Sequence, residues 1–498
     1  MNVIQTIEQE IAEIMSGNRL YTTYLSQWKY LLESYLGGQE YRDASHLTRY
    51  QLESDAEYNA RLLATPLDNH CKSVISVYNS FLFRECPERE FGAMENMPEV
   101  EDFLKDADFE GRSLDAFMKE VSTWSSVFGH SWIIVAKPNI NAVTRADEQA
   151  LGIRPYVNVL TPMVVLDWQW TRSPSGRFEL QYFKYLEDIN GDVHTVKEWT
   201  KETIRTTVVN IQDSIIYEDY TELNGLGKIP AIICYNARST VRGIGISDIS
   251  DIADAQRFIY NSTSEVEQTI RLDSHPSLVK TPETNAGIGA GSLIHMPENL
   301  DPGLKPYLLN FDGANIESIY QSIQHTITSI DKMANTGATR STINQVLSGV
   351  AMETEFQLLN AKLSEKADNI ELAEEQLWKL FAEYMGTTWD GEIEYPGSFN
   401  IRDTSREIDE LVKVKSAATD PRVIALVDHE LVEFLGEDAD LILPEVVTLM
   451  NGETVPYDST EPFEYPEEMF NPMTGESIMV NDFQSRRNAF LNGLIEKE

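Results

Sequence analysis

The residue types that usually carry out catalysis are present, but they lack the spacing that catalysis requires. No GxxxxGKS/T phosphate loop occurs, so the chain is not an ATP-driven motor of that class. Gly243-Ile244-Gly245 and Gly287-Ile288-Gly289 are GxG fragments without the rest of a dinucleotide fingerprint, and no GxSxG nucleophile elbow is found. The eight histidines are scattered, with no HExxH or HxH pair. We therefore expect a protein that is not an enzyme; an enzyme whose site combines distant residues is the alternative.

Patterns typical of metal sites are also missing. Cys71, Cys86 and Cys234 are odd in number and widely spaced, which argues against a disulfide framework and against a CxxC metal site. We expect free thiols that are buried or half-buried. The acidic cluster within 437–440 lacks the spacing of an EF-hand loop, so a specific calcium site is not expected. The sequence therefore predicts no metal ion and no cofactor.

The charge of the chain excludes a conventional nucleic-acid-binding surface. There are 80 acidic and 40 basic side chains, which give a formal net charge of −40. A protein that grips DNA usually carries a basic patch, whereas this chain repels a phosphate backbone on average. Solubility is the simpler explanation of the acidity. The sharper explanation is a surface that lies beside DNA without binding it, because phosphate contacts would make the polymer adhere.

The length and hydropathy of the chain indicate a multi-unit globular protein. Its 498 residues predict two to four folding units, and 42% hydrophobic residues are enough for real cores. No stretch of the sequence reaches the roughly 18 uninterrupted apolar residues that a membrane span needs. The first residues lack the basic region of a signal peptide, so we expect the chain to stay in the cytoplasm where it is made.

Periodicity predicts an α+β first half. Helices are expected over 1–36, from Ser54 with a bend at Pro66, and over 113–127 with a stop at Gly129. A series of strands is expected over 131–236. The Asn190-Gly191 dipeptide between two of them predicts a hairpin. The strands therefore form an antiparallel sheet.

The second half is expected to be mainly helical, with one irregular insertion. Met352–Tyr384 carries an apolar stripe at helical spacing over about nine turns. Its Glu371, Glu374, Glu375 and Glu383 are expected on a solvated or intersubunit face. The other elements follow in this order: a helix over 247–272, a Pro- and Gly-rich insertion with short β pieces over 273–314, a helix over 316–333, a polar loop over 336–351, a strand near 392–401, and helices near 408–414 and 421–435.

This order resembles the portal protein family of tailed bacteriophages. Several local segments over about 30–435 also look like that family; they include Tyr35-Leu36-Gly37-Gly38, Glu57-Tyr58-Asn59-Ala60-Arg61, Gly227-Lys228-Ile229-Pro230, Ile259-Tyr260-Asn261-Ser262-Thr263-Ser264-Glu265 and Ser348-Gly349-Val350-Ala351. The resemblance implies a portal fold with these parts: an α/β wing (1–246), a first stem helix (247–272), a small β-containing clip (273–314), a second stem helix (315–335), a tunnel loop (336–351), a long tunnel helix that returns to the wing (352–400), a helical crown (401–450) and an acidic, partly disordered tail (451–498).

The resemblance also implies a function. Portal proteins form a ring, typically a dodecamer, at one vertex of the capsid. The ring conducts double-stranded DNA during packaging and ejection. Its expected partners are the terminase large subunit, then a head–tail adaptor, together with major capsid and scaffolding proteins, and no membrane. The expected location is the portal vertex of the virion, after assembly in the host cytoplasm. Another head-completion or adaptor protein of the virion is the alternative.

Two sets of site residues follow from the resemblance. Arg340 is the one formal charge of the tunnel loop, and a ring would repeat it as a sparse positive collar around DNA. The alternative for residues 336–351 is a surface loop without a role in DNA passage. The alternative for residues 273–314 is a simple surface excursion between two helices. The predicted tunnel-loop residues are Thr336, Arg340, Ser341, Thr342, Asn344 and Gln345. The predicted clip residues, which would contact motor or adaptor, are Lys280, Thr281, Glu283, Asn285 and His295.

The acidic residues are concentrated toward the end of the chain. Residues 391–470 hold 20 acidic and five basic side chains. In a portal, the crown lies inside the capsid beside packed DNA, so the resemblance implies that these acidic walls prevent adhesion of the genome.

Overall fold

The computed structural model describes the chain in two compact units, Met1–Phe399 and Asn400–Glu498. Both helices and sheets are present in quantity, so the predicted α+β class is confirmed. The described residues are 2–138, 151–274, 277–282, 295–296, 298–299, 301–309, 314–340, 349–397, 399, 404–418, 421–433 and five short strands between 446 and 496.

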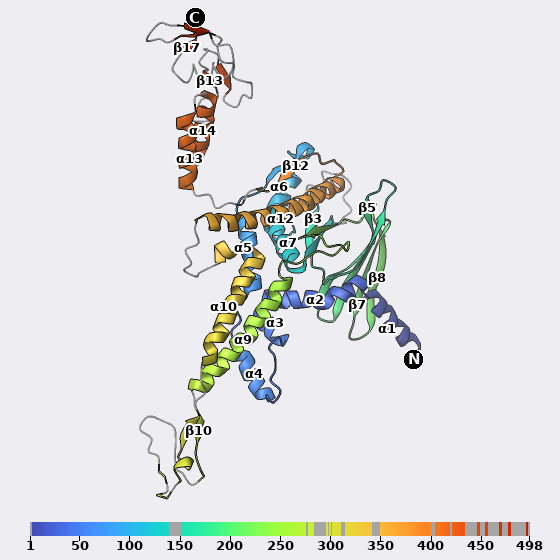
Figure 1. Ribbon diagram of the computed structural model, residues 1–498. Coiled ribbons are helices and arrows are strands. Elements are labelled where there is room, and N and C mark those ends of the chain that lie inside the picture. Colours follow the sequence, from blue (N-terminus) through green and yellow to red (C-terminus); the bar gives the residue numbers. More distant parts are fainter. Residues whose placement is uncertain are drawn as a thin grey trace. The chain divides into compact units, whose positions relative to one another are not determined.

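Seven helices and one short strand precede the main sheets in the first unit (Figure 1). Ser54 makes a capping box with Glu57, and the Ser113 side chain caps a later helix. The predicted helical stretch over 1–36 is confirmed as two helices, because the Asn18 side chain accepts a hydrogen bond from the Tyr21 backbone and starts a new helix. The bounds are α1 Asn2–Ile14, α2 Arg19–Leu36, α3 Gly38–Asp43, α4 Asp55–Ala64, α5 His70–Leu82, β1 Glu88–Glu90, α6 Pro98–Lys105 and α7 Leu114–Phe128.

Two antiparallel sheets follow. The smaller has the order β3-β2-β9 and the larger the order β4-β5-β6-β7-β8. The predicted hairpin is confirmed, since Asn190 pairs with Val193 across a two-residue turn. β8 lies inside the range 131–236 predicted to contain strands, but no separate strand was predicted at its position. The bounds are β2 His130–Ala136, β3 Tyr156–Leu160, β4 Val165–Arg172, β5 Phe178–Asn190, β6 Val193–Thr200, β7 Thr203–Asn210, β8 Ile215–Leu223 and β9 Ala231–Tyr235.

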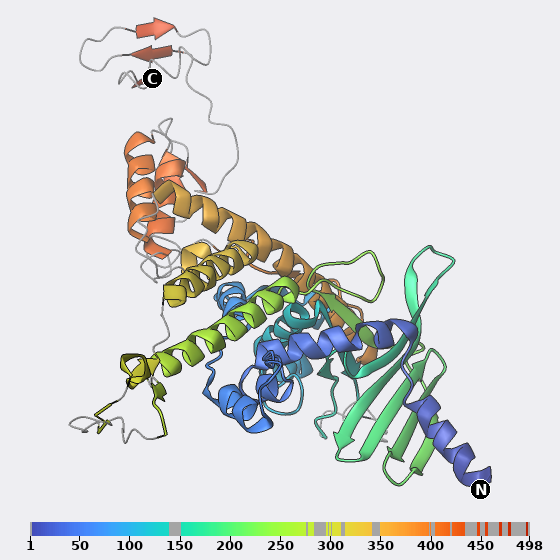
Figure 2. The same ribbon diagram turned by 60° about the horizontal axis from the view of Figure 1, so that its bottom comes forward.

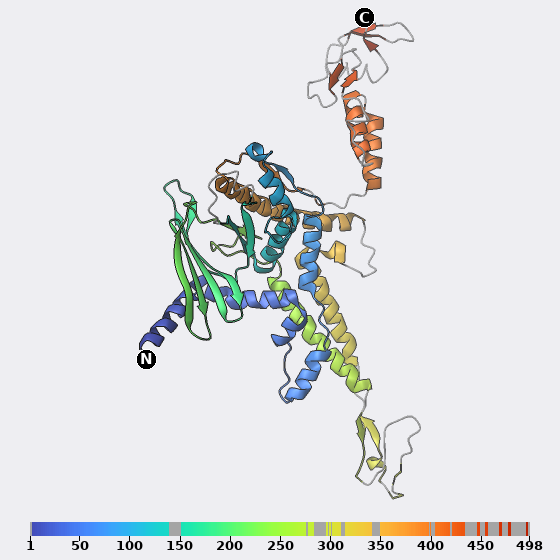
Figure 3. The same ribbon diagram turned by 180° about the vertical axis from the view of Figure 1, so that it is seen from behind.

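Helix α1 covers part of one face of the larger sheet. Its Ile11 and Ile14 are buried against Val196 of β6 and Val209 of β7. Figure 3, which shows the molecule from behind, displays α1 beside these strands. This contact explains the periodic isoleucines at the start of the chain.

The second half of the unit is built on long helices. The predicted long helix is confirmed as α12, Gly349–Tyr384, and it buries Leu359, Leu363 and Leu377 in the main core. Each such buried leucine contributes about 2 kcal/mol through removal of its surface from water. The remaining elements are α9 Ser250–Ser274, β10 Ser277–Val279, a 3-10 turn Pro302–Leu304, β11 Tyr307–Leu309, α10 Ala314–Ala334, α11 Gly337–Arg340 and β12 Glu392–Glu394, which pairs with β1.

The second unit consists of two packed helices and short strand pairs. Lys415 forms an ion pair with Asp428 between the two helices. The predicted helices near 408–414 and 421–435 are confirmed. The bounds are α13 Thr404–Ala417, α14 Pro421–Glu433, β13 Val446–Thr448, β14 Thr454–Pro456, β15 Glu468–Phe470, β16 Ser477–Met479 and β17 Ile495–Glu496.

Two glycines bring α7 against the loop after β9. Gly129 has a φ of 91°, in the left-handed region, and its backbone lies against Gly245. A Cβ on Gly245 would lie 1.8 Å from the Gly129 carbonyl oxygen, so only glycine fits there. The adjacent His130 is fully buried, and its Nδ1 accepts a hydrogen bond from the Gly245 N–H at 3.3 Å.

Burial of His130 should make the first unit sensitive to mild acid. It lowers the pKa of His130 to about 3. The unfolded chain takes up a proton near pH 6.5, whereas the folded chain does not, so stability is lost as pH falls below about 6.5. We expect the free energy of unfolding to fall by about 2 kcal/mol between pH 7 and pH 5. Urea unfolding of His130→Gln should show a correspondingly shallower pH dependence; equal dependence in both proteins would contradict this assignment.

Candidate functional site

Helices α9 and α10 lie side by side and antiparallel, with the insertion between their ends (Figure 2). Ile259 and Val266 of α9, and Ile323 and Ile330 of α10, are buried. At the far end β10 and β11 form an antiparallel pair in which Val279 lies opposite Tyr307. This pair forms the base of the insertion. Of the two predicted β pieces, the one at 276–280 is confirmed, and the one at 292–295 lies mostly outside the described residues.

The structure describes three of the five predicted clip residues. Lys280 and His295 are exposed, and Thr281 is half-buried. Glu283 and Asn285 lie outside the described residues. The contact with motor or adaptor stays a prediction for all five.

The segment between α10 and α12 is only partly a loop. Asn335 ends α10 with a φ of 56°, and the next residues form the short helix α11. Thr336 is fully buried, and its N–H donates to the Asp331 carbonyl at 2.9 Å, so in this conformation its side chain lines no surface. This corrects the prediction that Thr336 faces a channel. Ser341, Thr342, Asn344 and Gln345 lie outside the described residues.

Arg340 is bound by the protein itself. Its Nη1 lies 2.9 Å from Asp331 Oδ1, and its Nη2 donates to His70 Nδ1 at 2.7 Å. The other ring nitrogen of His70 lies 3.2 Å from Asp68. Only 12% of the Arg340 side chain is exposed. We call Arg340, Asp331, His70 and Asp68 the arginine latch. It joins α11 to α10 and to the start of α5.

Burial and charge pairing have opposing effects on the pKa values of the carboxyl groups in the arginine latch. Burial raises the pKa of Asp331, and Arg340 opposes this shift. The hydrogen bond from His70 lowers the pKa of Asp68. Arg340 therefore offers no freely exposed charge to DNA in this conformation, and a collar of arginines would require release from Asp331.

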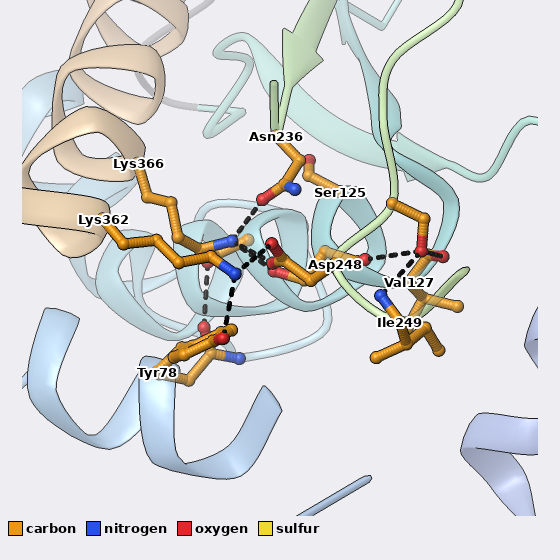
Figure 4. A network of polar contacts seen from close by, with 12 residues as sticks. Tyr78, Ser125, Val127, Asn236, Asp248, Ile249, Lys362 and Lys366 are labelled. Atoms are coloured by element: carbon orange, nitrogen blue, oxygen red, sulfur yellow. Dashed lines mark hydrogen bonds and ion pairs between the residues drawn. The ribbon is translucent and has the colours of Figure 1, made fainter. Parts of the chain in front are cut away.

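A second polar cluster lies inside the unit (Figure 4). Lys366 Nζ donates to Asp248 Oδ2 at 2.6 Å and to Ser126 Oγ at 2.8 Å, and it also contacts Asn236. Lys362 Nζ lies 3.1 Å from Asp248 Oδ1 and donates to Tyr78 OH at 2.9 Å. We call this set the buried junction: Tyr78, Ser126, Asn236, Asp248, Lys362 and Lys366.

The buried junction joins five segments at one point. Asp248 lies two residues before α9, Asn236 follows β9, the two lysines come from α12, and Ser126 lies in α7. Tyr78 of α5 donates its hydroxyl to the Ala334 carbonyl at the end of α10, 2.5 Å away. The body ends of both α9 and α10 are thereby tied to the long helix.

Charge pairing holds the junction together. Burial alone would raise the pKa of Asp248, but Lys366 and Lys362 reverse this and lower it to about 2. Burial lowers the pKa of Lys366, and Asp248 opposes that shift. For Lys362 the attraction of Asp248 outweighs burial and raises the pKa. Asp248 is thus a buried anion held between two ammonium groups.

Sequence reasoning missed the junction and misplaced one glutamate. Lys362 and Lys366 are four residues apart beside the apolar stripe, and that position was the available signal. Glu374, predicted on a solvated or intersubunit face, is fully buried within this unit. It accepts hydrogen bonds from Arg89 and Tyr395, both at 2.6 Å, and so joins β1 and the segment after β12 to α12.

The described residues show neither a metal-binding group nor a membrane span. Within that part of the chain, no group of three or more His, Cys, Asp or Glu side chains is placed to hold a metal ion. No described helix is long and apolar enough to cross a membrane. Cys71 and Cys234 are buried free thiols, but Cys86 is exposed, contrary to expectation.

Comparison with known proteins gives distant structural likenesses. No protein-family model matches the chain, and no curated protein matches it. A solved structure described as the neck of an empty gene transfer agent (GTA) particle, with C6 symmetry, is similar at 12% identity and a TM-score of 0.45, over 80% of this chain and 99% of the other. Two more are a chain of the native GTA virion (12% identity, TM-score 0.43, 79% and 97% covered) and one of the native GTA neck, with C12 symmetry (11%, 0.42, 72% and 89%).

Proposed function

We propose that this chain is the subunit of a ring-shaped virion protein of the portal type, which conducts double-stranded DNA at one vertex of a capsid. One observation carries the proposal: α9 and α10 lie side by side, separated in sequence by an insertion with a strand pair, and are followed by a short connecting segment and the 36-residue helix α12. A ring of such helix pairs would surround a channel.

Exposed apolar side chains on the helix pair support assembly into a ring. Phe258 and Ile270 of α9 are 47% and 41% exposed, and Tyr320 and Met333 of α10 are 45% and 44% exposed. Large apolar side chains on two neighbouring helices favour burial against another protein surface. Adjacent copies in a ring would cover them. At 1.5 Å per residue, the 25 residues of α9 would line roughly 37 Å of channel.

The acidity of the chain supports conduction rather than retention of DNA. With a net charge of −40, the surface repels phosphates on average. Arg340 is the charge that could follow the DNA, and the arginine latch restrains it. A conduit of this kind lets the polymer slide, because few phosphate contacts must be broken at each step.

The same proposal includes the partners, the subunit number and the location of the ring. The insertion between α9 and α10 would contact the terminase large subunit and later a head–tail adaptor, and the outer surface would contact capsid and scaffolding proteins. The ring would be a dodecamer located in the virion, and the chain would not be an enzyme. Another head-completion or adaptor protein is the alternative.

Negative-stain electron microscopy of the purified chain tests the proposal. We expect rings with a central hole. Phe258→Asp should reduce their yield, because a charge would replace a side chain that a neighbour buries. Leu52→Asp is the matched control, since Leu52 is 98% exposed on a surface loop. Particles without a hole would favour an adaptor, and monomers under all assembly conditions would refute the ring.

A further inference from the structure

A cavity lined by two arginines lies among the described residues, in a protein with twice as many acidic as basic side chains. It has a volume of about 380 Å³ and lies between the β4–β5 edge of the larger sheet, the loop after β9 and one face of α12. Arg238 and Arg242 line it together with Trp170, Phe178 and Leu372.

Aromatic rings hold the two arginines of this cavity and the neighbouring Arg172. The guanidinium carbon of Arg242 lies 3.6 Å from the centre of the Phe178 ring, and that of Arg172 lies 4.8 Å from the same centre. Arg238 lies over Tyr235 at 5.5 Å. Stacking fixes the plane of a guanidinium group and leaves its N–H donors available at the edge.

These arginines are not neutralised by the part of the chain that the structure describes. None of Arg172, Arg238 and Arg242 has a described carboxylate within ion-pair distance, and all three are exposed. Other arginines of the same unit do have such partners; Arg205, for example, lies 2.9 Å from Asp219. Two guanidinium groups in the cavity wall and a third on the neighbouring Phe178 ring, all without a described carboxylate partner, indicate a site for carboxylates or another planar anion.

The walls also contain apolar surface, which narrows the class of ligand. Leu372 is 42% exposed and Phe178 is 40% exposed. A ligand that fits must therefore present carboxylates next to apolar side chains. A polypeptide segment with alternating acidic and aromatic residues has this composition, whereas a bare phosphate backbone does not.

Strand β8 of the same chain has that composition. Glu218 and Glu222 have no described cationic partner, and Tyr217, Tyr220 and Leu223 are 54%, 46% and 85% exposed. β8 is an edge strand, so its outer backbone groups are also unpaired in the sheet. The strand combines the carboxylates and the apolar surface that the cavity requires.

The positions of the two features on the sheet suit a head-to-tail contact. In the strand order β4-β5-β6-β7-β8, the cavity lies at the first edge and β8 forms the opposite edge. In a closed ring, each subunit presents one surface to the next copy and a different surface to the previous one. Opposite edges of one sheet meet this requirement.

We propose that Arg172, Arg238 and Arg242 of one copy bind Glu218 and Glu222 on strand β8 of a second copy. The inference rests on the ring proposed above. It supplies local attraction between subunits that otherwise repel each other through their net charge of −40.

Charge reversal on both surfaces tests this contact. Ring formation would be followed by mass photometry and electron microscopy for wild type, Arg238→Glu/Arg242→Glu, Glu218→Arg/Glu222→Arg and the variant with all four changes. We expect each double variant to require a roughly tenfold or higher subunit concentration for assembly. The fourfold variant should assemble as wild type does, because its charges are complementary again.

A matched control separates the contact from the change in net charge. Arg19→Glu/Lys119→Glu alters the net charge as much as Arg238→Glu/Arg242→Glu does, at exposed positions on α2 and α7. It should leave assembly close to wild type. All substituted side chains are exposed, and a urea unfolding curve for each variant verifies that the fold is retained.

The outcomes distinguish this inference from the ring itself. Wild-type rings together with unaffected double variants would overturn the inference and leave the ring standing. Absence of wild-type rings would overturn both. Fluorescence anisotropy with a short DNA duplex tests whether DNA occupies the cavity instead. If Arg238→Glu/Arg242→Glu abolished DNA binding and left assembly unchanged, the cavity would be assigned to phosphates and the contact between copies would be overturned.

Discussion

Asp248→Asn should lower the free energy of unfolding of the first unit by about 3–5 kcal/mol, the loss that follows when one partner of a buried ion pair is removed. Asp248 is 5% exposed and lies between Lys362 and Lys366 at 3.1 and 2.6 Å. Asparagine keeps the size of the side chain but removes its charge, so two ammonium groups would remain without a counter-ion. Chemical denaturation measures the change.

Two further variants identify the cause of that loss. Asp254→Asn makes the same chemical change on an exposed residue of α9 and should cost less than about 1 kcal/mol. Adding Lys366→Met to Asp248→Asn should recover part of the stability, because it removes an uncompensated charge. A stability for Asp248→Asn within 1 kcal/mol of wild type would show that the junction is not held by charge.

The same pairing predicts a response to strong acid that is distinct from that of His130. The pKa of Asp248 is about 2 in the folded chain and near 3.9 in the unfolded chain. The contribution of Asp248 to the free energy of unfolding is therefore complete above pH 4 and is lost as pH falls toward 2. The loss assigned to His130 begins near pH 6.5, so the two titrations occupy different ranges.

Asp331→Asn should strengthen DNA binding of the assembled protein by roughly tenfold at low salt. In the arginine latch, Asp331 holds Arg340 at 2.9 Å, and a neutral asparagine would leave the guanidinium free to move toward a phosphate. In a ring, every subunit would release one arginine at the same time. The logarithm of the affinity should then fall more steeply with the logarithm of salt concentration, since each phosphate contact releases counter-ions.

Fluorescence anisotropy with a short DNA duplex measures this effect. Asp331→Glu is the matched control, because it keeps the negative charge and should bind DNA as weakly as wild type. Adding Arg340→Gln to Asp331→Asn should remove the gain. If Asp331→Asn bound DNA no better than wild type, Arg340 would not be the residue that meets DNA.

Local signals were sufficient to predict most of the fold. The apolar stripe of α12, the stop at Gly129 and the hairpin at Asn190-Gly191 each depend on residues close in sequence, and the structure confirms all three. β8 was missed for a physical reason. Almost none of its residues is buried, so it has no alternation of apolar and polar side chains, and hydrogen bonds to β7 hold it in place.

The candidate sites were less predictable, because charged residues look alike until their partners are known. Glu374 sits among other glutamates on α12, yet its partner Arg89 is 285 positions away. Lys366 meets Asp248 across 118 positions. Nothing in the local sequence distinguishes these side chains from solvated ones.

By itself, the sequence determined the α+β class, the order of helices, insertion and long helix, the net charge of −40 and the single charge at Arg340 in the segment 336–351. These properties depend on composition and on neighbours a few residues apart. Only the tertiary structure decided which charges are buried, which are paired and which have no described partner at the cavity. Burial and pairing are contacts between segments far apart in the chain, and folding alone brings those segments together.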